Sequence, residues 1–315
     1  MSYQTFVGID IGKDTVVVAV HGETAAPRSF PNTPRGIKAV RRRAAQHWPQ
    51  AFVVLEATGG YEADLVVALL EQGLAVHRAD PRAASFFLRS LGTRAKTDAL
   101  DAQGLARYGA ERHAELACYH LPDATQTQLA ALLSRRADLL AMRTAEVNRQ
   151  QHPRYRPLAA SVQAVLAVLQ EQLAALEAQV ATLLRTTPTL HAKATVLRQV
   201  TGIGPQTAQT LLAFLPELGT LTRRAAASLA GCAPHPRDSG LQRGYRRTVG
   251  GRALVKRALF MAAMAARTHH PDLRQFYERL CQHGKPPMVA LTALMRKLVV
   301  ILNAKLRDAA QTPTW

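Results

Sequence analysis

The sequence predicts an α/β domain at the N-terminus, a long helical arm in the middle and a mostly helical domain at the C-terminus. Short apolar runs alternate with helical patterns over residues 1–112, as is typical of an α/β domain. A strict heptad of apolar residues follows within residues 113–189. Residues 190–315 then read as helices around one Gly-, Pro- and Arg-rich loop at 231–251.

Four strands and three helices are expected in the first domain. The apolar runs at 3–10, 15–21, 51–56 and 74–78 predict the strands. The first helix begins at Pro34, after the capping residue Thr33, and runs towards Trp48. The others are expected at 62–72, where Gly73 ends the helix, and at 97–110.

The arm is expected to be two helices separated by the break at 152–157. The first spans 125–151, and the second carries an apolar seam with spacings of four and three. The seam residues are Val162, Leu166, Leu169, Leu173, Leu176, Val180 and Leu183, and the facing stripe is Leu129, Leu133, Leu140 and Val147. We interpret this as an antiparallel coiled coil. The alternative is a helix packed within a globular core.

A possible nucleic-acid contact lies at the start of the last domain. Residues 197–215 fit a helix-hairpin-helix, in which two helices flank a loop containing Gly202 and Gly204. Such a loop offers backbone N–H groups to phosphate without reading base sequence. A plain helical turn with glycines is the alternative.

The charge of the chain indicates a polyanionic partner. Its 315 residues include 40 Lys and Arg against 22 Asp and Glu, which gives a formal net charge of +18. Nucleic acid is the usual partner of so basic a protein. The three cysteines lack metal-ligand spacing and are expected to be reduced thiols of a cytoplasmic protein. We expect no signal peptide and no membrane span, since Arg296 and Lys297 interrupt the most apolar late stretch.

Four carboxylates are candidate ligands of a metal ion. Asp10 and Glu56 end predicted strands, and Asp98 and Asp101 share one helix face. Convergent carboxylates favour Mg²⁺, and two such ions can stabilise both oxygens of a phosphoryl displacement. Each acid could instead be a turn former or a surface residue, and the neighbouring acids Asp14, Glu62 and Asp64 are competitors for the role.

A serine lies at the centre of the most basic segment. Residues 221–257 hold nine Arg or Lys and one acid, Asp238, and Ser239 stands in their midst. Flanking cations could hold a phosphodiester while the serine attacks it. The candidate nucleic-acid contacts here are Arg237, Arg243, Arg246, Arg247 and Arg252. Ser239 could equally be a surface residue of a DNA-binding loop, and Tyr245 is a rival nucleophile.

These segments together resemble a known family, the RNA-guided bridge recombinases among the IS110 transposases. The N-terminal matches are 8–13 (GIDIGK), 55–61 (LEATGGY) and 96–102 (KTDALDA), and they look like the DEDD set of that family's RuvC-like, RNase H-fold domain. The C-terminal matches are 229–234 (LAGCAP), Ser239–Gly240 and 250–252 (GGR). The resemblance covers nearly the whole chain.

The resemblance implies a mechanism and partners. Asp10, Glu56, Asp98 and Asp101 would bind Mg²⁺, and Ser239 would form a 5′-phosphoserine link with DNA. A structured non-coding guide RNA would choose the donor and target DNA. The two half-sites would meet between protomers of a homo-oligomer, a dimer or tetramer, with the arm mediating assembly.

Three other classes of function remain as alternatives. A RuvC-like nuclease or junction resolvase would need only the carboxylates. An ATPase of the actin or sugar-kinase type also begins with a Gly-Ile-Asp-Ile-Gly strand, but it normally has a second domain with further phosphate loops. A non-enzymatic nucleic-acid binder would share the salt dependence of binding but have no covalent chemistry.

Overall fold

The chain forms two compact units, Met1–Leu121 and Pro122–Trp315. The computed structural model describes residues 3–92, 95, 97–236, 238–240, 242–244 and 246–311. Each unit has its own hydrophobic core. The arm and the C-terminal helices share the second unit.

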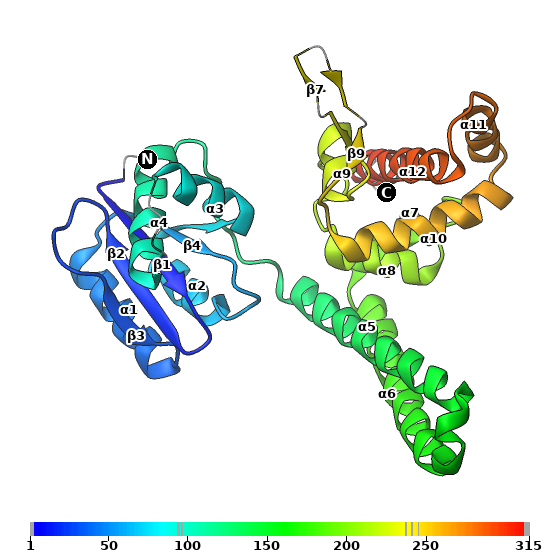
Figure 1. The fold of residues 1–315 in the computed structure, drawn as a ribbon, viewed down its shortest axis with the longest axis horizontal. Coiled ribbons are helices and arrows are strands. Elements are labelled where there is room, and N and C mark those ends of the chain that lie inside the picture. Colours follow the sequence, from blue (N-terminus) through cyan, green and yellow to red (C-terminus); the bar gives the residue numbers. More distant parts are fainter. Residues whose placement is uncertain are drawn as a thin grey trace. The chain divides into compact units, whose positions relative to one another are not determined.

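The first unit is built on a five-stranded mixed sheet (Figure 1). Its strands are β1 (Thr5–Ile11), β2 (Thr15–Val20), β3 (Arg28–Pro31), β4 (Ala51–Glu56) and β5 (Ala75–Ala79), in the order β3-β2-β1-β4-β5. The first three strands pair antiparallel, whereas β4 and β5 run parallel to β1. The α/β prediction for this region is confirmed, with strand ends within two residues of the expected ones.

Side-chain alternation along β1 separates two helical layers. Val7, Ile9 and Ile11 point into a core shared with α1 (Pro34–His47) and α2 (Ala63–Leu70). Gly8 and Asp10 point to the opposite face, which is covered by α4 (Asp98–Arg112) with α3 (Pro81–Ser90) beside it. This second face carries the candidate acids.

Two elements of the first unit were not predicted from the sequence. Strand β3 is a four-residue edge strand that ends on a proline, which is too short for a clear alternation. Helix α3 begins at Pro81, directly after its N-cap Asp80, whose side chain accepts hydrogen bonds from the backbone N–H groups of Arg82 and Ala83. That capping signal was present in the sequence, and it could have predicted the helix.

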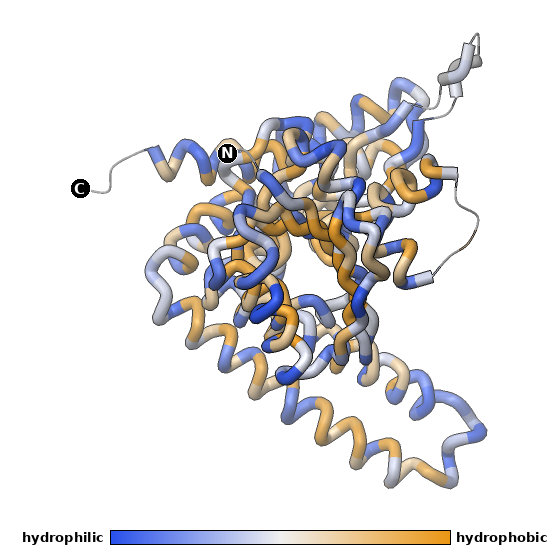
Figure 2. Tube along the Cα trace, turned by 90° about the vertical axis from the view of Figure 1, so that its left-hand side faces the viewer, coloured by the Kyte–Doolittle hydropathy of each residue, from blue (hydrophilic) through white to orange (hydrophobic). Residues whose placement is uncertain are grey.

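The second unit begins with a long helical hairpin. Helices α5 (Ala124–Gln151) and α6 (Ala159–Thr186) pack side by side, joined by the 3-10 turn η1 (Pro153–Leu158), and the turn end is hydrophilic (Figures 1 and 2). Leu169 and Leu173 of the predicted seam are buried against Leu139. At the other end, Leu129 and Val180 belong to the main core of the unit.

The described part of the unit contains six further helices. They are α7 (Pro188–Arg198), α8 (Pro205–Phe214), α9 (Arg223–Leu229), α10 (Ala253–His269), α11 (Pro271–Gln282) and α12 (Pro287–Gln311). Helix α12 buries Leu294, Leu298 and Leu302 at its centre. Both polar ends of its buried Asn303 are bonded, because the side chain accepts from the Gly219 N–H at 2.8 Å and donates to the Leu221 carbonyl at 2.7 Å.

The expectation that no segment approaches a membrane span needs correction. Pro153–Thr186 and α12 are both long and apolar enough to cross a membrane by length and composition. Helix α12 packs in the core of its unit, whereas α6 buries part of its apolar seam against α5 and has only 17% of its apolar window buried. Two such helices are only a weak indication of a membrane.

The three cysteines are free thiols, as expected. Cys232 is buried, and its burial raises the pKa of the thiol to about 11. Cys118 and Cys281 are partly exposed.

Candidate active site

Asp10 and Glu56 end neighbouring parallel strands on the same face of the sheet. The register of β1 and β4 pairs Gly8 with Val54 and Ile9 with Leu55, so Asp10 and Glu56 are next in line. Two-residue alternation turns both acids away from the core that contains Ile9 and Leu55.

Helix α4 brings two more acids to this edge. A Cβ on Gly8 would collide with the backbone of α4 at Ala102 and Ala106, so the strand and helix are in close contact. Further along the helix, Gly109 lies against Phe52 and Val54. The helix therefore runs antiparallel to β1, and its first turn, which carries Asp98 and Asp101, lies at the Asp10 end. Thr97 caps it by accepting from the Leu100 N–H.

The burial of Asp10 and the charges of the other acids raise its pKa. Burial, and then the charges of Asp98, Asp101 and Glu56, raise the pKa of Asp10 from 3.8 to about 6. Among the described residues, no three His, Cys, Asp or Glu side chains already converge on one point, so the carboxylates would have to turn inward to share an ion. An all-oxygen donor set with mutual repulsion fits a hard divalent cation such as Mg²⁺, which would relieve that repulsion.

Of the competing acids, Glu62 has a structural role. It is 3% exposed and pairs with Arg78 at 2.5 Å. Its carboxylate also accepts from the N–H groups of Thr58 and Gly60, which fixes the loop that follows Glu56. Burial alone would raise the pKa of Glu62, but the backbone donors and Arg78 outweigh it, and the pKa is lowered. Glu62 and Arg78 are 16 positions apart in the sequence, so spacing could not reveal the ion pair. The other two competing acids, Asp14 and Asp64, are exposed.

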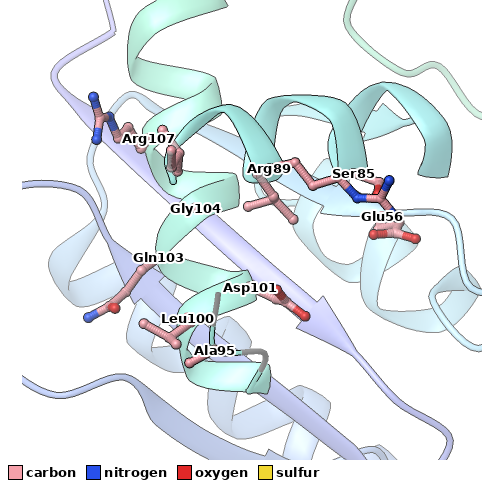
Figure 3. Close-up of a pocket in the computed structure, with 11 residues that line it drawn as sticks. Glu56, Ser85, Arg89, Ala95, Leu100, Asp101, Gln103, Gly104 and Arg107 are labelled. Atoms are coloured by element: carbon pink, nitrogen blue, oxygen red, sulfur yellow. The ribbon is translucent and has the colours of Figure 1, made fainter. Parts of the chain in front are cut away.

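A pocket opens beside the carboxylates, with a volume of about 570 Å³. Its lining includes Glu56 and Asp101 together with Ser85 and Arg89 of α3, and Glu56 lies beside Ser85 and Arg89 (Figure 3). The Arg89 side chain reaches towards Glu56 and Ser85, which places a cation at the edge of the acidic site.

Ser239 lies near the tip of a β-hairpin that the sequence analysis described only as a loop. Strand β7 (Asp238–Ser239) pairs with β8 (Gln242–Arg243), and Gly240 in the turn has φ +54°. Nearer the base, β6 (Pro234–His235) pairs with β9 (Arg247–Thr248). Ser239 is exposed, and the hairpin projects from the helices of its unit (Figure 1).

The base of this hairpin is closed by two glycines. Gly231 and Gly251 both have positive φ, at +66° and +78°, and a Cβ on Gly251 would collide with the backbone of Gly231. The Arg252 N–H also donates to the Leu229 carbonyl at 2.8 Å. The two ends of the hairpin are thus held against each other.

Arg252 anchors the hairpin to the helices. Its guanidinium bonds both oxygens of Glu217, at 2.6 and 2.7 Å, and the Phe214 carbonyl at 2.9 Å. These bonds use much of the hydrogen-bonding capacity of the guanidinium. The geometry therefore gives Arg252 a positioning role, whereas the sequence predicted a contact with phosphate. Arg246 and Arg247 are exposed, Arg243 lies in β8, and Arg237 and Tyr245 lie outside the described residues.

The two glycines of the predicted helix-hairpin-helix differ. Gly202, at φ +98°, packs so closely on α10 that a Cβ would lie 2.9 Å from the Ala262 carbonyl oxygen. Gly204 is exposed, precedes α8 as its N-cap and has open space around its Cβ position. Packing therefore accounts for Gly202, whereas Gly204 is accessible at the start of a helix.

Comparisons with known proteins define the class. Residues 7–152 match a family described as Transposase, and residues 194–278 match the Transposase IS116/IS110/IS902 family. The Pilin gene-inverting protein of Moraxella lacunata is 29% identical over 97% of this chain and 96% of its own length. The Insertion element IS110 uncharacterized 43.6 kDa protein of Streptomyces coelicolor is 37% identical over 38% of this chain and 30% of its own.

The fold, the acidic site and these matches define a DNA transposase or recombinase, an enzyme that acts on DNA. The chain belongs to the IS110 family of transposases. One solved structure, T. thermophilus RuvC in complex with Holliday junction substrate, is 17% identical and covers 37% of this chain and 100% of that one, with a TM-score of 0.29.

Proposed function

We propose that this transposase cuts and rejoins DNA with Ser239 as nucleophile and a RuvC-like carboxylate site as its electrostatic partner. The observation that carries the proposal is the placement of Asp10, Glu56, Asp98 and Asp101 at one edge of the sheet, where burial, and then the charges of the other three acids, raise the pKa of Asp10 to about 6. The exposed Ser239 at a hairpin tip supplies a hydroxyl that can reach a phosphodiester.

Each step of the reaction exchanges one phosphoester bond for another. The Ser239 oxygen attacks phosphorus and loses its proton, and the 3′-oxygen of the DNA leaves and takes one up. A 5′-phosphoserine link and a free 3′-hydroxyl result. Attack by another strand's 3′-hydroxyl then reverses the step and restores the serine, so no external energy source is needed.

The chain's own residues divide the work. Asp10, Glu56, Asp98 and Asp101 would hold Mg²⁺, which when bound would neutralise charge developing on the phosphate. The exposed Arg246 and Arg247 near the hairpin base would hold the DNA backbone, as would Arg237 and Arg243. Gly204 would offer the N-terminus of α8 to a second phosphate, in a helix-hairpin-helix.

Three segments would share the function. Residues 1–112 would be the RuvC-like domain, 113–189 a coiled-coil arm that mediates assembly, and 190–315 the domain that carries the serine. The buried seam of α5 and α6 supports the coiled coil. By resemblance to bridge recombinases, a guide RNA would choose the donor and target DNA, and the sites would be completed between protomers of a dimer or tetramer. The net charge of +18 supports a large nucleic-acid partner.

A covalent protein–DNA adduct tests the proposal. The full-length protein is incubated with Mg²⁺, the RNA transcribed from its flanking element, and matching donor and target DNA, and then run on a denaturing gel. We expect an adduct that is lost in Ser239→Ala and in Asp10→Ala, and kept in Ser134→Ala, which removes an exposed serine from α5. Loss in Tyr245→Phe alone would move the nucleophile to the tyrosine.

The alternative function is a metal-dependent nuclease or junction resolvase. The acidic site by itself favours it, because such enzymes need no protein nucleophile. Cleaved DNA without an adduct, unchanged in Ser239→Ala, would establish this alternative and overturn the serine mechanism.

A further inference from the structure

Helix α3 presents an exposed aromatic ring and a cation beside the acidic pocket. Phe86 is 71% exposed, the largest exposure among the large hydrophobic side chains described. Arg89 follows it by three positions, so the two side chains are neighbours on the helix surface. Arg89 also lines the pocket with Glu56 and Asp101 (Figure 3).

The opposite face of α3 explains why Phe86 is not a misplaced core residue. Phe87 packs on Tyr108 of α4, with ring centroids 4.7 Å apart, and Leu88 fills the space that a Cβ on Gly104 would take. Ala84 is fully buried. These contacts fix the rotation of the helix and leave Phe86 facing outward, where an exposed ring has no packing function.

Arg89 is available as an anion-binding group. Among the described residues, no acidic side chain forms an ion pair with it, whereas Arg107, which lines the same pocket, pairs with Glu111 at 2.5 Å. A guanidinium suits a phosphate because its donors match two oxygens at once. An aromatic face suits a nucleobase because every base can stack on it.

We propose that Phe86 and Arg89 form a subsite for one unpaired nucleotide of the DNA strand next to the scissile phosphate. Arg89 binds its phosphate at the rim of the acidic pocket, and Phe86 stacks on its base. A paired base is already stacked on both sides, so the subsite selects DNA whose helix is opened at the cleavage point. This inference rests on the proposed function for its place in the reaction, but not for the binding itself.

Tryptophan fluorescence of a Phe86→Trp variant tests the subsite. The full-length variant is titrated with an unlabelled dT12 oligonucleotide, in EDTA so that no metal-dependent cleavage occurs. We expect quenching of the new tryptophan, and Arg89→Ala in the same background should weaken the binding that causes it by about 5-fold to 20-fold. The wild-type protein, whose Trp48 and Trp315 also fluoresce, gives the background that is subtracted, so that the remaining quenching reports on residue 86.

The control removes the same charge from the other side of the sheet. Arg35 is exposed on α1, and Arg35→Ala should leave the quenching curve within about 2-fold, the change expected for one distant charge. Phe86→Ala should leave the melting temperature unchanged, because the ring is exposed.

Three results would overturn the subsite. They are the absence of quenching when anisotropy of a labelled dT12 shows saturation, equal quenching by a 12-base-pair duplex, and quenching by rU12 but not by dT12. The last would make the platform an RNA contact. The assay needs no serine, so its outcome is independent of the adduct test. A wild-type adduct that is lost in Ser239→Ala, combined with a failed quenching titration, would overturn the subsite alone, and quenching without any adduct would overturn the serine mechanism alone.

Discussion

The carboxylate site and the serine hairpin differ in how firmly each is held. The acids stand on two central strands and on a helix packed so tightly that Gly8 has no room for a Cβ. Ser239 stands on two-residue strands at the tip of a hairpin that is fixed mainly at its base. A tightly packed site can be preorganised for charge stabilisation, whereas a nucleophile on a projecting hairpin depends for its position on how the base of the hairpin is closed.

Gly8→Ala should disrupt the packing of β1 on α4 that holds the carboxylate site. The added methyl would meet backbone atoms of α4, which cannot move aside like a side chain. We expect a loss of about 3 kcal/mol in the free energy of unfolding of the first unit. Hydrogen exchange of the full-length protein measures it, since amides of β1 and α4 should lose protection while those of α12 keep it.

The control is Gly204→Ala, where the Cβ position is open and φ is −79°. It should cost less than about 0.5 kcal/mol. Equal protection in Gly8→Ala and wild type would mean that strand and helix are not held as tightly as described.

Gly251→Ala should disrupt the hairpin that carries Ser239 without affecting the carboxylate site. The methyl would strike Gly231 and open the base of the hairpin. We expect the rate of adduct formation to fall about 30-fold, equivalent to about 2 kcal/mol, while the first unit keeps its stability. A quenched time course on denaturing gels gives the rate.

Gly250→Ala separates the collision from backbone strain. Gly250 has φ +74°, close to the +78° of Gly251, but its Cβ position is open. If both variants lose the same activity, left-handed strain alone is responsible and the glycine contact does not position the serine.

Asp10→Asn should show how much the crowded charge at Asp10 costs the stability of the carboxylate site. Native Asp10 keeps its proton up to about pH 6, while the unfolded chain loses it near 3.8, so the native state loses stability as pH rises through that window. The asparagine variant should therefore be more stable above pH 6 without divalent metal, by about 1 kcal/mol after allowance for screening at this partly exposed group. Below pH 3.8 the difference should vanish.

Urea unfolding in EDTA at pH 7.5 and pH 3.5 measures this effect, with Asp64→Asn as a control at an exposed carboxylate. Added Mg²⁺ should stabilise wild type more than Asp10→Asn. A variant that is less stable than wild type at pH 7.5 without metal would contradict the crowding of charge around Asp10.

The sequence predicted local features better than contacts between distant segments. Strand 51–56 matches β4, and the seam from Val162 to Val180 is buried at four of its positions, because periodicity is a local property. The short ladders around Ser239 were missed, since pairs of two residues have no period. The Glu62–Arg78 pair and the exposed side of α3 depend on which chain segments meet, and the sequence does not state that.

The closed base of the serine hairpin has a consequence for protein engineering. Because Leu229 and Arg252 are hydrogen bonded to each other, everything between them is a loop whose ends are already joined. Lengthening such a loop costs little, about 0.6 kcal/mol for each doubling of its length. Longer or shorter hairpins that carry the same serine should therefore still fold on this helical support.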